Sequence, residues 1–165
     1  MALALATLAD ELLALEPVGD EPGAIDNLSS AWENYFADAS VLGIPTTVGS
    51  LAAATTAMKG ALVGLSVAGA GAAKLQAGIV AFWGVVAVSA ATIWLTVPPP
   101  LSATPPPGLA GIAAALTPVF ASNAAGSLSL ADSANAVAAV LHPLQLGGIA
   151  LIPPPPAGLG PQPIL

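Results

Sequence analysis

Apolar residues recur at steps of three and four along most of this 165-residue chain, and this spacing predicts helices. The predicted helices are 2–16, 27–40, 46–68 and 71–97, followed by a pair within 108–143. The Pro-rich stretches around these segments cannot be helical, because proline lacks the amide hydrogen and clashes with the preceding turn. We therefore expect a mainly α-helical protein, a small helical bundle with a long apolar helix.

Proline clusters and loss of the helical pattern divide the chain into five segments of one assembly domain, 1–165. These are an N-terminal helix with an acidic linker (1–22), a helical core (23–97), a Pro-rich linker (98–107), a helical pair (108–143) and an extended Pro-rich arm (144–165). One domain is the usual organisation at this length.

Local signals suggest where individual helices begin and end. Ser30-Ala-Trp-Glu33 and Ser129-Leu-Ala-Asp132 each fit a capping box or a close variant of it, which marks a helix start. Pro106 or Pro107 can occupy the first turn of the next helix. We expect Pro118 to kink or end that helix, and His142-Pro143 to end the last one.

The longest predicted helix is apolar all round, so it belongs in a protein core or in a membrane. Residues 76–97 carry no charge and are long enough to span a bilayer. Trp83, however, lies inside this run, whereas tryptophans of membrane spans favour the ends. The neighbouring helices also have polar faces. We therefore favour a buried core helix and keep a membrane span over 76–97 as the alternative.

Two sets of residues are candidates for contacts with other helices or subunits. A stripe of small residues on the long helix would let another helix approach closely, and it consists of Ala77, Ala81, Gly84, Val88 and Ala91. The arm carries apolar anchors at both ends of a stiff polyproline spacer. Its predicted interface residues are Ile149, Leu151, Ile152, Pro153, Pro154, Ile164 and Leu165. We expect the arm to lie extended against a neighbouring subunit.

Composition sharpens this expectation. Charged residues make up 7% of the chain and hydrophobic residues 56%, so the chain cannot cover its whole surface with charge and must hide apolar area in subunits or lipid. The net charge is −7 with only two lysines, which argues against nucleic acid as a partner. Acidic residues concentrate in the first 38 positions, with Asp132 the exception, so the N-terminal quarter is the predicted solvated part.

The sequence shows no catalytic signature. Asp132, Ser133 and His142 are the residue types of a nucleophilic triad, but they follow one another on one predicted helix and need not converge. At the end of that helix the dipole would favour protonated His142. A single histidine and no cysteine make a metal centre improbable. We predict a non-enzymatic protein without cofactor or metal.

The chain resembles small Ala- and Pro-rich virion proteins of tailed bacteriophages and related contractile particles. The resemblance rests on AWENYFADA, GIVAFWG, PPPGLAGIAAALTPVF and the closing IPPPPAGLGPQPIL. It implies a structural subunit of a neck, tail, baseplate or capsid, located in the virion, with copies of itself and other structural subunits as partners. It transfers no functional residue. The hydrophobicity of residues 76–97 departs from this pattern, and it keeps a small membrane protein of holin type as the alternative.

Overall fold

The computed structural model describes residues 4–15, 19–37, 40–41, 44–45, 51–93, 102–145, 149–151 and 162–163. Helices dominate these ranges, which confirms a mainly α-helical fold. The helices are α1 (Leu5–Leu13), α2 (Glu21–Ala37), α3 (Leu51–Leu62), α4 (Gly71–Ile93), the 3₁₀ helix η2 (Pro107–Gly111), α5 (Ile112–Ala124) and α6 (Leu130–Gln145). The strands are β1 (Ser40–Val41), β2 (Ile44–Pro45), β3 (Ser102–Thr104), β4 (Ile149–Leu151) and β5 (Gln162–Pro163).

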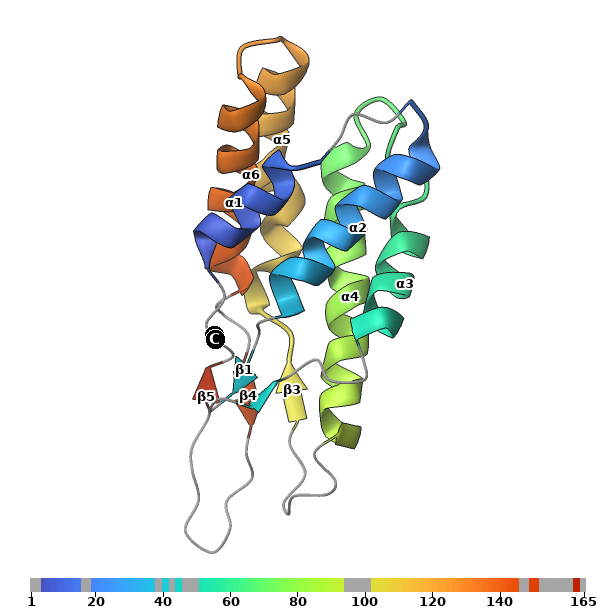
Figure 1. Cartoon of the computed structure of the whole chain (residues 1–165), viewed down its shortest axis with the longest axis vertical. Helices are drawn as coiled ribbons and strands as arrows, with labels where there is room; N and C mark the ends of the chain where they lie inside the picture. Colours follow the sequence, from blue (N-terminus) through green and yellow to red (C-terminus); the bar gives the residue numbers. More distant parts are fainter. Residues whose placement is uncertain are drawn as a thin grey trace, which may run out of the picture.

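The α-helices form a closed bundle in which neighbours in sequence are neighbours in space. Each helix from α1 to α6 packs against the next one, and α6 packs back against α1 (Figure 1). The short strands gather at one end of this bundle. Because every helix has two helical neighbours, each needs a broad apolar face, which explains why the chain is so rich in Ala, Leu and Val.

Aromatic side chains from α2 and α4 form the centre of the core. The ring centroids of Phe36 and Phe82 lie 4.9 Å apart, and Phe36 stands edge-on to Trp83 at 5.4 Å. Trp32 meets Phe82 edge-on at 6.3 Å. Such pairs contribute about 0.5–1.5 kcal/mol each beyond the area they bury. The aromatic stripe of the second predicted helix is therefore part of the core.

Helix α2 begins earlier than its pattern suggested. Asp20 accepts a hydrogen bond from the Gly23 amide at 2.7 Å, so it caps the helix, and Pro22 follows in the first turn, where a proline is tolerated. The capping box proposed at Ser30–Glu33 is wrong, because these residues lie in the middle of α2. Ser30 and Glu33 fit the residue pattern of a capping box. The buried face of α2 nevertheless begins earlier in the chain, at Ile25, so the helix starts before them.

The two internal prolines do not end their helices. Pro118 lies inside α5 and Pro143 inside α6, which continues to Gln145. The predicted helix end at His142–Pro143 is therefore wrong. At the start of α6 the prediction is confirmed, because the Ser129 hydroxyl donates to the Asp132 carboxylate at 2.6 Å and accepts from the Asp132 amide at 3.1 Å. The predicted proline start is also confirmed, at η2.

Helix α4 covers Gly71–Ile93 of the predicted long helix, and residues 94–97 lie outside the described ranges, so the long apolar helix over 71–97 is not confirmed as such. Ile79, Phe82 and Trp83 on α4 are fully buried within the protein, which places this part of the helix in the core. No helix in the described ranges is long and apolar enough to cross a membrane.

Two strand groups complete the described fold. β1 and β2 form an antiparallel pair, with Val41 opposite Ile44. β3, β4 and β5 form a second antiparallel sheet in the order β3-β4-β5. Thr104 lies opposite Ile149, so the Pro-rich linker and the start of the C-terminal arm meet in this sheet.

Candidate interaction surface and internal cavity

The three residues with catalytic side chains have separate environments on α6. Asp132 is engaged with Ser129 at the helix start, Ser133 is buried against apolar neighbours, and His142 contacts Tyr35 of α2. A nucleophile needs a base within hydrogen-bond reach and a third group that orients the base. The structure does not bring these side chains together in that way.

His142 forms a partly buried pair with Tyr35. The Tyr35 hydroxyl lies 2.8 Å from His142 Nδ1. Burial lowers the pKa of His142 from 6.5 and raises the pKa of Tyr35. The two neutral groups share this hydrogen bond, and its direction depends on the imidazole tautomer. The predicted shift of His142 towards its protonated form is wrong, because burial lowers its pKa although it lies in the last turn of α6.

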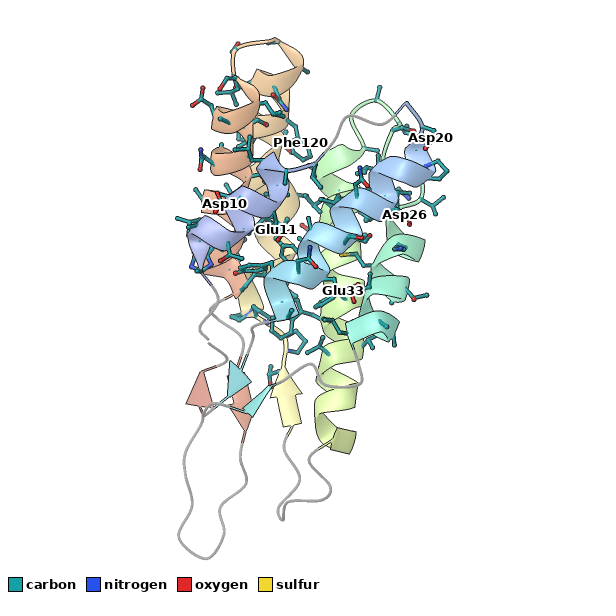
Figure 2. The ribbon with its side chains drawn as sticks, viewed as in Figure 1. Asp10, Glu11, Asp20, Asp26, Glu33 and Phe120 are labelled. Atoms are coloured by element: carbon teal, nitrogen blue, oxygen red, sulfur yellow. The ribbon has the colours of Figure 1, made fainter. Side chains whose placement is uncertain are left out.

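Charge is concentrated on one side of the bundle. Figure 2 shows Asp10 and Glu11 on α1, Asp20 just before α2, and Asp26 and Glu33 on α2. These helices lie together on the side of the bundle that faces the viewer. This acidic surface is the part of the protein that solvates well, as the N-terminal clustering of acids predicted.

Two acids of this surface connect α2 to the neighbouring α3 region. Asp26 pairs with Lys59 of α3 at 2.8 Å. Glu21 accepts the Gly64 amide at 2.7 Å, and the amide and hydroxyl of Ser66 also donate to it. These hydrogen bonds lower the pKa of Glu21, led by the Ser66 hydroxyl. Gly64 has a φ of 89°, so glycine suits this turn and Glu21 holds it in place.

The exposed surface of α3, α4 and α5 contrasts with the acidic surface. Among the described residues of these three helices, Lys59 and Lys74 are half-buried, and every exposed position is uncharged. We call these positions the uncharged face, and they are Ala52, Ala53, Thr56, Gly60, Ala73, Ala77, Val80, Gly84, Ala114, Ala115, Thr117, Pro118, Ala121, Asn123 and Ala124. Most of the side chains are small, so other backbones can come close to these helices.

The predicted small-residue stripe belongs to this uncharged face. Ala77 and Gly84 are exposed and Ala81 is half-buried; a Cβ added at Gly84 would meet no atom within 4 Å. The side chains of Val88 and Ala91 lie beyond the described ones. The stripe therefore packs against no helix of its own chain at Gly84. Contact with a second chain stays a prediction.

The glycine that permits close helix packing inside the chain is Gly78, which the pattern did not single out. A Cβ there would lie 3.0 Å from two side-chain atoms of Leu62 and 3.3 Å from Met58, both on α3. Residue size could have identified Gly78 from the sequence, because it shares its helix face with the bulky residues Leu75, Ile79 and Phe82. Periodicity could not separate this buried face from the exposed one, because both are apolar.

The described part of the arm pairs within its own chain. β4 contains Ile149 and Leu151, and its backbone partners are β3 of the linker and β5 near the C-terminus. The backbone is extended there, as expected, and its described backbone partners belong to this chain; contact of the arm with a neighbouring subunit stays a prediction. The other predicted arm residues, Ile152, Pro153, Pro154, Ile164 and Leu165, lie outside the described ranges.

An apolar cavity of about 380 Å³ lies between α1, α4, α5 and α6, and Leu28 of α2 also lines it. Leu12, Leu75, Phe120 and Val137 are among its walls, and Ser133 is the polar side chain among the described wall residues. A second hollow of about 380 Å³ shares Phe120 with the first, and Thr117 and Ala121 line it. Sequence reasoning did not anticipate either space, since a cavity depends on side chains from several helices whose arrangement no local pattern encodes.

The described residues contain no group of three or more His, Asp or Glu side chains that could hold a metal ion. Comparison of the chain with family models, curated proteins and solved structures gives no match. The uncharged face, the acidic surface and the cavity are the features of the described structure that bear on function.

Proposed function

We propose that this chain is a non-enzymatic structural subunit of a multi-subunit assembly, in which the uncharged face packs against other subunits. The observation that carries the proposal is the separation of charge, with acids on α1 and α2 and none on the exposed positions of α3, α4 and α5. Interfaces are depleted in charge at their centre. A solvated surface of this size would ordinarily mix both signs of charge.

The kind of assembly that we propose is a bacteriophage virion, as a neck, tail, baseplate or capsid-associated component. The support is the Ala- and Pro-rich style of the sequence together with the small-residue surface. Copies of the same chain and other structural subunits are the proposed partners. In this proposal the long helix α4 supplies the contact stripe, and the extended Pro-rich linker and arm add contacts at the end of the bundle that carries the strands.

The test compares two charge insertions on opposite sides of the bundle. Ala77→Glu places a carboxylate on the exposed stripe of α4, and Ser30→Glu places one on exposed α2. Neither site is buried in the isolated chain, so both variants are expected to fold. A carboxylate buried without a partner in an interface is strongly unfavourable. We expect Ala77→Glu to weaken self-association at least about tenfold, or about 1.4 kcal/mol, and Ser30→Glu to leave it unchanged.

Sedimentation velocity of the full chain, across micromolar concentrations, measures this difference. Gly84→Leu serves as a second variant without charge, because its side chain would block close approach of a neighbouring helix. A monodisperse wild-type monomer would contradict the proposal. A wild-type chain that stays in solution only with detergent and purifies with lipid would support the membrane alternative instead.

A further inference from the structure

We propose that the cavity between α1, α4, α5 and α6 binds a small neutral ligand with an apolar body and one hydrogen-bonding group, of the alcohol or phenol class. In this arrangement the apolar body fills the space beside Leu12, Leu75 and Val137, and the polar group meets the Ser133 hydroxyl. The inference does not depend on the assembly function, because these residues are not part of the uncharged face.

The size and walls of the cavity favour an apolar guest over water. The cavity measures about 380 Å³ and opens to solvent beside the exposed Leu130, so a ligand can enter it. Ligand pockets typically have volumes of about 300–1,000 Å³ with mostly apolar walls and a few polar groups. The wall residues that the structure describes include no charged side chain, so an ionised ligand would lose its hydration there without a counter-charge from them.

Ser133 supplies the polar contact. Only 7% of this residue is exposed, and its amide donates to the Ser129 carbonyl at 2.9 Å as part of α6. Its hydroxyl makes no hydrogen bond to another residue in the described part of the chain. Among the described residues, the fully buried side-chain polar atoms without a partner are Ser29 Oγ and Trp32 Nε1, so the Ser133 oxygen remains accessible from the cavity. A ligand hydroxyl that both donates and accepts therefore suits this wall better than a hydrocarbon does.

Phe120 sets the boundary of the cavity. It lies near the upper end of the bundle in Figure 2, and it contributes to both hollows. Two of its ring atoms are 3.3 Å from the place where a Cβ on Gly71 would stand. The absence of a side chain at Gly71 lets the ring lie close to α4, so Phe120 limits the length of the ligand that fits.

Isothermal titration of the full chain with 1-octanol tests the proposal, and 1-chlorooctane, which lacks the hydroxyl donor, serves as the matched probe. We expect saturable binding of one 1-octanol per chain and weaker binding of 1-chlorooctane. Ser133→Ala should reduce the affinity for 1-octanol about 2- to 12-fold, the effect of one neutral hydrogen bond, and should leave 1-chlorooctane unchanged. Alanine is compatible with a helix, so this variant is expected to fold.

Ala134→Phe, which fills the cavity from α6, should abolish binding of both probes, whereas Ala139→Phe at an exposed position of α6 should bind like the wild type. If Ala134→Phe fails to fold, the Ser133→Ala comparison decides alone. Non-saturable uptake of 1-octanol, or an equal loss of both probes in Ser133→Ala, would overturn the proposal.

Discussion

The indole nitrogen of Trp83 donates a hydrogen bond to the side-chain oxygen of Gln145 at 2.6 Å, and both residues are fully buried. The bond joins the middle of α4 to the last residue of α6. Gln145 also donates to the Leu141 carbonyl at 3.3 Å, so its amide group has partners on both sides. A polar pair in an apolar core is stable only while both members remain.

Removing one member of this pair should therefore destabilise the protein. Gln145→Leu leaves the Trp83 N–H buried without a partner, and we expect the free energy of unfolding to fall by about 1–3 kcal/mol. Urea denaturation of the two single variants and of Trp83→Phe/Gln145→Leu should show a coupling energy of about 0.5–3 kcal/mol. Asn135→Leu, at an exposed site of α6, is the control. Strict additivity would mean that the bond contributes nothing.

Two glycines on α4 should respond oppositely to the same substitution. Gly78→Ala brings a methyl group within 3.0 Å of Leu62, which is itself fully buried and cannot move away. Overpacking of this kind costs about 1–3 kcal/mol. Gly84→Ala meets no neighbour, so alanine's helix propensity should stabilise the isolated chain by up to about 1 kcal/mol. Thermal unfolding of both variants makes the comparison, and a Gly78→Ala protein as stable as Gly84→Ala would contradict it.

Stability should decline as the pH falls through 6.5 because of the single histidine. Burial lowers the pKa of His142 in the folded state below the unfolded value of 6.5. The unfolded chain therefore takes up a proton that the folded chain resists, and the free energy of unfolding falls as the pH drops from above 6.5 towards the folded pKa. His142→Gln should flatten this dependence in denaturation curves. A slope that persists in His142→Gln would place its origin elsewhere.

Glu21 should make the stability depend on pH in a second, more acidic range. Its hydrogen bonds to Gly64 and Ser66 lower its pKa from 4.5, so the stabilisation is complete above pH 4.5 and disappears as the pH falls through the folded pKa. The amide NMR shifts of Gly64 and Ser66 should titrate in this acidic range. Glu21→Gln should remove the titration, whereas Glu33→Gln, further along α2, should keep it. Shifts that remain constant through the acidic range would show that Glu21 does not hold the turn.

The helical class and most helix positions could be predicted from the sequence, because apolar spacing is a local property. Helix ends were harder. Ser30 and Glu33 matched a capping pattern as well as Asp20 does, and only the packing of Ile25 and Trp32 decides between them. Pro143 was expected to stop α6, but the helix tolerates it in its last turn, where Gln145 is anchored to Trp83.

Which helix faces are exposed was harder to predict than where the helices lie. On α4 both faces are apolar, so the pattern could identify a small-residue stripe but could not say that Gly84 is exposed while Gly78 lies against α3. Side-chain size distinguishes the two faces of α4, because the large apolar side chains of Ile79 and Phe82 must be buried and the methyl group of Ala77 need not be. The cavity at Ser133 and the Glu21 contact with the Gly64 turn join segments distant in sequence, and no single-sequence pattern reports such contacts.

The closure of the bundle by α1 against α6 has a consequence for how the protein is made. On the ribosome α1, which ends at Leu13, is made well before its neighbour α6, which begins at Leu130. At about 5–20 residues per second, Leu8 and Leu12 wait on the order of ten seconds before α6 can cover them. During that interval the nascent chain exposes the apolar face of a short helix that also carries acidic residues, and a chaperone could bind it in this form. Translation speed over α5 and α6 should therefore influence the yield of soluble protein.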